Sequence, residues 1–285
     1  MSALRRVRER FRDLDRTLRL RLPSPWWRWV GAAARLPRLH RREVRLTLRE
    51  EAIIERALAA GEGDGAGALA PPGTSERVIE IPWVVRRLPG GAERILDVGT
   101  TFAPLVYQRL LSRVPATELH TVDLVPTRLP FGIAHRADVR SLPFPSGHFD
   151  AVVCISTLEH IGLDNTRYIA GGAQPPDDEG DAATLSELAR VLREDGIAFV
   201  TVPAGRAATF ATQRQYSLER WRAVVERAGL EVDEQDVFVH VDASGWRRAE
   251  RDEVAARTYA EGAPFAAAVI CAALRRSRGA EHGDG

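Results

Sequence analysis

The sequence predicts an α/β protein built on a doubly wound, mostly parallel sheet of seven strands with an antiparallel last strand. Two observations lead to this prediction. Short apolar segments alternate with helical segments over most of the chain, as in parallel sheets covered by helices. The final two apolar segments follow one another without a helix long enough for a crossover, which favours an antiparallel pair. A chain of 285 residues with 45% hydrophobic content can bury a large core around such a sheet.

The elements are expected in a regular order. A helix capped by Thr74 or Ser75 comes first, and Pro82 should bend or interrupt it. Strands are expected at 93–98, 117–124, 133–138, 149–155, 196–202, 231–241 and 264–274, and helices near 104–114, 183–193 and 217–228. No internal repeat interrupts this order, so we expect one α/β domain over residues 74–275, followed by a polar tail at 276–285.

The first 60 residues differ from the rest in charge. They hold sixteen arginines against seven acidic residues, carry helical apolar spacing at 2–22 and 41–60, and place Trp26, Trp27 and Trp29 between these two segments. We expect a basic helical N-terminal extension at 1–60, joined by a flexible linker at 61–73. This extension could pack on the same chain, pair two subunits or contact an anionic membrane surface.

Composition excludes several other classes. The net charge of +1 and the absence of an aromatic stacking platform beside the arginines argue against a nucleic-acid partner. The chain start lacks a signal-peptide pattern, and no segment has the apolar length of a membrane span. Cys154 and Cys271 lie in apolar segments, as expected for buried thiols in a reducing compartment, so we expect a cytoplasmic protein, at most peripheral at the inner membrane surface. The seven histidines show no HxxxH-type spacing, and we expect no metal site.

Polar residues follow four of the predicted strands. Asp97 and Gly99 follow the first strand, Asp123 and Asp138 end the next two, and Ser156 follows the fourth. In open α/β sheets, ligands bind at the carboxyl ends of the strands. A single Asp in such a place is commonly a turn or cap residue, but three carboxylates at three consecutive strand ends indicate a binding site.

At this point the chain resembles a known family. The segments RILDVGTTFAPL, TVDL and ADVRSLPFPSGHFDAVVCISTLEHIG resemble successive motifs of the class I S-adenosylmethionine-dependent methyltransferases. ELARVLREDGIAFVTVP resembles the helix and fifth strand that follow in that family, so the resemblance covers about residues 74–275. RVIEIPWV, EHIGL and AGRAATFATQRQYSLERW look like a type 11-like, functionally unassigned subgroup, some members of which lie among polysaccharide and glycoconjugate genes.

The resemblance implies S-adenosylmethionine as cofactor, and the residue types suit it. Gly99 would let the backbone approach the cofactor closely, and the N–H groups that follow would suit its carboxylate. Asp97 could hold the cofactor's ammonium, and Asp123 could accept two hydrogen bonds from the ribose hydroxyls. By resemblance, Asp138 and Val139 would bind the adenine edge and Leu124 its face. The expected cofactor-binding residues are therefore Asp97, Gly99, Thr100, Thr101, Asp123, Leu124, Asp138, Val139 and Ser156.

One loop position departs from the family. Thr101 stands where the family usually has glycine, and its branched Cβ disfavours a positive φ. The loop must take a different path, and this leaves open a catalytically degenerate scaffold that acts through its basic N-terminal helices at a membrane or a protein partner. A nicotinamide-dependent enzyme on a similar sheet is a third hypothesis, which explains Gly99 and Asp123 but not the segment 138–161.

Candidates for catalysis come from the loops after the fourth and fifth strands. His160 is the expected general base for O-methylation of a small-molecule or sugar-containing acceptor, although its ring could instead hydrogen-bond backbone. Glu159 beside it is expected to be structural. The long loop 162–181 is typical of a lid. Arg206 and Tyr216 are expected to bind the acceptor.

Overall fold

The computed structural model describes residues 38–60, 70–100, 103–124, 131–165, 176–259 and 266–277, with side chains of the first helix from residue 49 onward. Residues 1–37 with the three tryptophans, most of the expected linker, Thr101, the middle of the expected lid and the end of the tail lie outside the described residues.

One eight-stranded sheet organises the described chain. Its strands are β1 (Arg94–Val98), β2 (Glu118–Asp123), β3 (Ile133–Arg136), β4 (Phe149–Ile155), β5 (Leu192–Pro203), β8 (Leu230–Val241), β9 (Gly245–Arg248) and β10 (Ala268–Arg276). The spatial order is β3-β2-β1-β4-β5-β10-β8-β9. The strands from β3 to β5 pair in parallel, and β10 pairs antiparallel with both β5 and β8. This confirms the doubly wound, Rossmann-like sheet and its antiparallel last pair.

The sheet has one strand more than we predicted. β9 pairs antiparallel with β8 through a short turn and forms an edge hairpin. The sequence pattern missed β9 because it is only four residues long, with two buried residues followed by two exposed arginines instead of an alternation.

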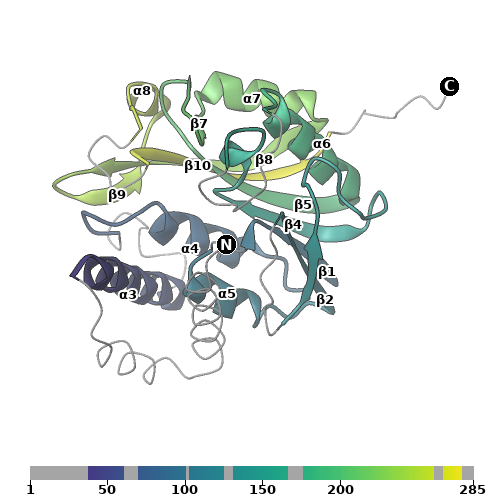
Figure 1. Ribbon diagram of the computed structural model, residues 1–285, viewed down its shortest axis with the longest axis horizontal. Coiled ribbons are helices and arrows are strands. Elements are labelled where there is room, and N and C mark those ends of the chain that lie inside the picture. Colours follow the sequence, from purple (N-terminus) through teal and green to yellow (C-terminus); the bar gives the residue numbers. More distant parts are fainter. Residues whose placement is uncertain are drawn as a thin grey trace, which may run out of the picture.

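Helices cover both faces of the sheet, as Figure 1 shows. α3 (Arg38–Ala59), α4 (Arg77–Arg87) and α5 (Leu105–Leu111) lie on one side, and α6 (Gly180–Val191) and α7 (Leu218–Arg227) lie on the other. Two apolar clusters result. Leu96 and Val98 of β1 belong to the cluster under α6 and α7, whereas Ile95 belongs to the cluster under α3, α4 and α5. The central strands are therefore buried on both faces, as their unbroken apolar sequences indicate.

Shorter elements complete the chain near one end of the sheet. They are the 3-10 turn η3 (Leu158–His160), the two-stranded ribbon of β6 (Ala208–Thr209) and β7 (Arg214–Gln215), and α8 (Arg251–Ala255).

The described part of α3 packs against α4 and α5. Ile53, Ile54 and Ala57 are buried in the same cluster as the residues of α4. Glu51 forms a buried ion pair with Arg109 of α5, with 3.2 Å between the carboxylate and guanidinium atoms. The C-terminal half of this basic helix is therefore part of the same core as the sheet.

The start of α4 differs from our expectation. Glu76 occupies the N-cap position and makes no side-chain cap hydrogen bond. The Thr74 hydroxyl instead donates to the Pro71 carbonyl at 2.8 Å, so the expected cap at Thr74 or Ser75 was wrong. Pro82 lies inside the helix, which continues to Arg87, because the surrounding helix residues are buried against the sheet and hold it in place.

Candidate active site

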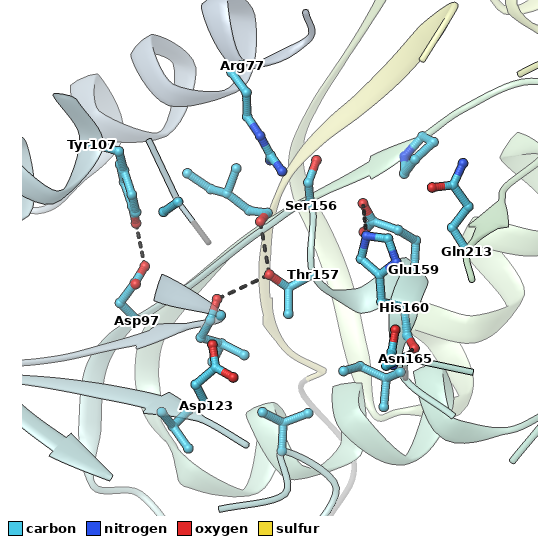
Figure 2. Close-up of a pocket in the computed structure, with 18 of the residues that line it drawn as sticks. Arg77, Asp97, Tyr107, Asp123, Ser156, Thr157, Glu159, His160, Asn165 and Gln213 are labelled. Atoms are coloured by element: carbon cyan, nitrogen blue, oxygen red, sulfur yellow. Dashed lines mark hydrogen bonds and ion pairs between the residues drawn. The ribbon is translucent and has the colours of Figure 1, made fainter. Parts of the chain in front are cut away.

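A cavity of about 270 Å³ lies at the carboxyl ends of β1, β2 and β4. Most of the predicted site residues line it: Asp97, Gly99, Asp123, Leu124, Asp138, Val139, Ser156 and His160. Figure 2 shows the labelled ones around a common space. Side chains from four separate segments of the chain thus meet where the parallel topology predicts a ligand site.

Asp97 is held by two hydroxyl groups. Its side chain is buried, and the hydroxyls of Thr100 and Tyr107 each donate to one of its carboxylate oxygens. Burial raises the pKa of Asp97 to about 7, although both hydrogen bonds favour the ionised form. A cationic group of a ligand would lower this pKa again, so Asp97 is suited to an ammonium. Tyr107 was not predicted, because it lies in an apolar stretch of α5 that reads as core.

Gly99 brings β1 close to the loop after β4. Its φ is +85°, and a Cβ placed there would lie 2.2 Å from Oγ1 of Thr157. Its N–H donates to the Val122 carbonyl of β2 at 3.0 Å. A side chain at position 99 would therefore clash with Thr157 and strain the backbone, so the glycine shapes the floor of the cavity.

We expect Gly99→Ala to destabilise the fold by about 2 kcal/mol or more, because alanine disfavours a positive φ and Thr157 blocks its Cβ. Gly91→Ala is the matched control, since a Cβ at Gly91 meets no atom within 4 Å. Urea unfolding should show a change within about 0.5 kcal/mol for the control. Equal stabilities of the two variants would contradict this account of Gly99.

Asp123 is the last residue of β2 and Asp138 follows β3, and the two carboxylates differ in their partners. Asp123 is half-buried at the cavity next to Leu124. Both Asp138 oxygens pair with the Arg140 guanidinium, at 3.1 Å from Oδ1 to Nε and 2.7 Å from Oδ2 to Nη2. Arg140 also pairs with Asp177 at 2.8 Å. Oδ1 of Asp138 also accepts from the backbone N–H of Arg140 at 3.0 Å, so the carboxylate is held in a fixed orientation at the cavity.

Ser156 takes part in a buried polar network. It has a φ of +40°, and its hydroxyl donates to Oε1 of Glu80 on α4 at 2.8 Å. The same Glu80 oxygen accepts from Thr201 at 2.8 Å, and Arg77 pairs with Oε2 at 3.0 Å. Glu80 thus ties α4 to the ends of β4 and β5. The Ser156 hydroxyl points toward Glu80, so any contact between Ser156 and a ligand would involve other atoms of Ser156.

His160 lies in η3 at the edge of the cavity. Its Nδ1 is 2.5 Å from the Thr212 carbonyl oxygen, so Nδ1 carries the proton and donates this hydrogen bond. Burial lowers the pKa of His160 below its ordinary value of 6.5. The ring therefore makes the backbone contact that we considered, and this contact directs the basic nitrogen of the neutral ring, Nε2, away from Thr212.

Glu159 lies beside His160 and is buried. One carboxyl oxygen is 3.8 Å from Nε2 of His160, as the dashed line in Figure 2 marks. The other, Oε2, has no hydrogen-bond partner among the described residues. Burial raises the pKa of Glu159 to about 8, so the carboxyl group is largely protonated at neutral pH.

This protonation predicts a pH-dependent stability. Between the ordinary pKa of 4.5 and about 8, the folded protein keeps a proton on Glu159 that the unfolded chain has lost. The free energy of unfolding should therefore fall as pH rises through this window, by an amount on the order of a few kcal/mol. Glu159→Gln, which resembles the neutral acid, should flatten the profile.

Urea unfolding of both proteins at pH values from about 5 to 9 provides the measurement. Asp97 and Glu76, whose pKa values burial also raises to about 7, contribute equally to wild type and variant. Parallel profiles would mean that Glu159 is ionised in the folded protein.

Several cavity residues were missed from the sequence. They are Glu76 at the N-cap of α4, Arg77 in its first turn, Tyr107, Asn165 and Tyr259. They lie far apart in the chain and carry no spacing pattern, so only the fold brings them together. Asn165 Oδ1 is buried without a hydrogen-bond partner among the described residues, and its amide group donates to the His160 carbonyl at 2.7 Å.

Two predicted acceptor residues require correction. Tyr216 is fully buried, and its hydroxyl donates to Asp181 of α6 at 3.0 Å, so it supports the core. Arg206 is exposed and does not line the cavity. Arg214 of the same segment is buried and donates to the Ile161 and Asp177 carbonyls, which fixes both ends of the expected lid. The sequence around Arg214 and Tyr216 has loop composition, but Arg214 lies in β7 and Tyr216 directly follows it, and both side chains are buried.

Comparison with known proteins agrees with this arrangement. Residues 96–200 match a family model described as a methyltransferase domain, whereas no curated protein matches the chain. The match spans β1 to β5 and so includes most of the cavity's strand ends. It confirms the resemblance to class I S-adenosylmethionine-dependent methyltransferases. Residues 96–200 are therefore similar to a methyltransferase domain.

Solved structures with similar folds include three examples. 1,6-Didemethyltoxoflavin-N1-methyltransferase from Burkholderia thailandensis is 14% identical over 86% of this chain and 93% of its own, with a TM-score of 0.46. An S-adenosylmethionine-dependent methyltransferase from Clostridium acetobutylicum is 12% identical over 70% and 91%, with a TM-score of 0.45. The [4+2]-cyclase SpnF is 17% identical over 81% and 94%, with a TM-score of 0.47.

No helix in the described part of the chain has both the length and the hydrophobicity needed to cross a membrane.

Proposed function

We propose that this protein is an S-adenosylmethionine-dependent methyltransferase that methylates an oxygen atom of a small-molecule or sugar-containing acceptor. One observation carries the proposal. Asp97, Asp123 and Asp138, which come from three successive strand ends, line one cavity together with Gly99. These residues lie in the segment that matches the methyltransferase model.

The residues present fit this cofactor. Its ammonium suits Asp97, whose buried carboxyl group accepts hydrogen bonds from the two neutral hydroxyls of Thr100 and Tyr107. Its ribose diol suits the half-buried carboxylate of Asp123. Asp138 and Val139 would hold the adenine edge and Leu124 its face, while the backbone N–H that follows Gly99, at Thr100, would face the carboxylate.

The cofactor supplies, when bound, an activated methyl group on a sulfonium. The chain then has to orient the acceptor and remove its proton. We assign the second task to His160, and two observations support this: its lowered pKa keeps the ring neutral at pH 7, and its Nδ1–H donates to Thr212. Nε2 would take the proton of the acceptor hydroxyl.

The cavity wall near His160 supports a hydroxyl-bearing acceptor. Glu159 Oε2 and Asn165 Oδ1 are buried there without hydrogen-bond partners among the described residues. Buried polar atoms are normally paired, so donors from a ligand would satisfy both. Arg77 and Gln213 add donors to the same cavity. A sugar-containing molecule carries closely spaced hydrogen-bond donors and acceptors, which could pair with these acceptor and donor groups of the cavity wall.

The first experiment titrates the purified full-length chain with S-adenosylmethionine by calorimetry, with NAD as the control ligand. Micromolar binding of S-adenosylmethionine and none of NAD would support the proposal and exclude the nicotinamide hypothesis. No binding at millimolar cofactor would overturn it in favour of the scaffold hypothesis. A screen of sugars, phenols and amines for release of S-adenosylhomocysteine would then separate O-methylation from N-methylation.

With an acceptor from that screen, we expect His160→Gln to lower kcat by about 10²- to 10⁴-fold, the usual contribution of a general base. The affinity for S-adenosylmethionine should change little. In the wild type, activity should fall as pH drops through the lowered pKa of His160, and the variant should lose this acidic limb. A variant with unchanged kcat would restrict His160 to its contact with Thr212.

We further propose a cytoplasmic location. Cys154 and Cys271 are both buried and free, which suits a reducing compartment. Contact of residues 1–60 with a membrane surface stays a prediction, because residues 1–37 lie outside the described structure.

A further inference from the structure

A second cluster of chemically active side chains lies at the amino ends of the strands, opposite the cavity at their carboxyl ends. Glu118 is the first residue of β2, and His120 follows two positions later on the same face. His148 directly precedes β4. Asp123 of the cavity is five residues beyond Glu118 along β2, about 17 Å at the usual strand rise. The cluster is thus separate from the proposed cofactor site.

The ligand atoms of this cluster point toward one another. One atom each from Glu118, His120 and His148 can be chosen so that all three lie within 4.8 Å of one another. Oε2 of Glu118 is 3.4 Å from Nε2 of His120. Three atoms bound to one zinc ion at about 2.0–2.2 Å lie about 3.3–3.6 Å apart. Small rotations of Glu118 and His148, which are both partly exposed, would bring the three atoms to these distances.

A further histidine orients His120. Nδ1 of His120 is 2.9 Å from Nε2 of His135 on β3. When the Nδ1–H donates to His135, the Nε2 lone pair of His120 faces a carboxylate oxygen of Glu118. A cation between these two acceptors would satisfy both. Metal-binding histidines commonly donate their other N–H to a fixed acceptor in this way.

The cluster is rigidly supported. The N–H groups of Gly147 and His148 donate to the Arg190 and Val191 carbonyls at the end of α6, at 2.9 and 2.8 Å. The His148 ring stacks on Phe144 with 5.9 Å between centroids, and it meets Phe149 edge-on at 4.8 Å. No hydrogen bond engages the His148 ring within the described part of the chain. Its ring nitrogens are therefore available to a metal ion.

The guanidinium group of Arg94 competes with a metal ion for the carboxylate of Glu118. Nε of Arg94 is 3.3 Å from Oε2 of Glu118, with both side chains about two-fifths exposed. Such an exposed ion pair contributes little to stability, so an ion bound by two imidazoles can replace or share it.

We propose that Glu118, His120 and His148 bind a divalent transition metal of the zinc class, with His135 as the hydrogen-bond partner that orients His120. Two imidazoles and one carboxylate suit zinc, cobalt or nickel better than calcium or magnesium, which prefer oxygen ligands alone. Water would fill the fourth position. The ion would join the start of β2 to the turn before β4. We expected no metal site from the sequence, because the histidines form no HxxxH-type pair. His148 lies 28 residues after His120, and only the folded sheet brings the two together.

The test uses the full-length protein after treatment with a chelator. Calorimetry with zinc chloride should give one ion per chain, and cobalt chloride should give the visible absorption of a four-coordinate site. Glu118→Gln and His148→Gln should lose this binding, and His135→Gln should weaken it by about 10- to 100-fold. Glu194→Gln, an exposed carboxylate at the start of β5, is the matched control and should bind as wild type.

Zinc should also raise the Tm of the wild type but not of His148→Gln, while circular dichroism confirms that each variant is folded. The proposal would be overturned if the wild type bound no zinc. It would also be overturned if His148→Gln and Glu118→Gln bound zinc with unchanged stoichiometry. Binding of S-adenosylmethionine should be the same in wild type and His148→Gln, so the outcome is independent of the proposed function.

Discussion

Asp123→Ala should abolish measurable binding of S-adenosylmethionine, with an affinity at least about 100-fold below that of the wild type. Two hydrogen bonds to a charged group contribute about 1.5–3 kcal/mol each, and each 1.4 kcal/mol is tenfold in affinity. The alanine side chain offers no acceptor to the ribose hydroxyls at the end of β2. Calorimetry of the purified variant measures the effect.

Two controls make this result interpretable. Asp195→Ala removes a carboxylate that is 84% exposed and should bind the cofactor as the wild type does. Asp123 is half-buried at the cavity edge, so its variant should keep a Tm close to that of the wild type. Tight binding by Asp123→Ala would mean that other residues bind the ribose and that the assignment of Asp123 to the ribose hydroxyls is wrong.

Glu80→Ala should destabilise the fold by about 3–5 kcal/mol, the usual effect of removing one partner of a buried ion pair. Glu80 is fully buried and accepts hydrogen bonds from Ser156, Thr201 and Arg77. Its loss leaves three donors without an acceptor and a cavity under α4. Urea unfolding measures the change.

Matched variants separate the network from general effects of substitution. Glu226→Ala on the exposed face of α7 should change stability by no more than about 0.5 kcal/mol. Glu80→Gln keeps an acceptor oxygen, so its stability should fall between those of Glu80→Ala and Glu226→Ala. If Glu80→Ala is as stable as Glu226→Ala, water or a rearranged Arg77 satisfies the network and α4 does not depend on it.

The strand ends were predictable because a regular physical rule connects them to function. Parallel strands place their carboxyl ends at one edge, so Asp97, Asp123 and Asp138 could be assigned to one cavity from their positions in the sequence alone. The antiparallel last pair followed from the absence of a crossover helix. Both inferences needed only local periodicity and chain order.

Contacts between distant segments were not predictable in this way. Glu80 lies on a helix that reads as a cover for the sheet, yet its carboxylate meets Ser156 and Thr201 inside the molecule. Tyr216 occupies a stretch with loop composition, and its burial depends on Asp181, which is 35 residues earlier in the chain. Partners of this kind are selected by three-dimensional packing, for which one sequence carries no periodic signal.

The place of β10 in the sheet has a consequence for how the chain assembles. The strand nearest the C-terminus lies between β5 and β8, and it is the only described strand that joins the parallel half to the β8–β9 hairpin. During synthesis, both halves leave the ribosome before the strand that connects them. The sheet cannot close until β10 has been synthesised, and until then β5 and β8 each expose an unpaired edge. Truncation before residue 268 should therefore yield two half-sheets prone to aggregation instead of a smaller folded protein.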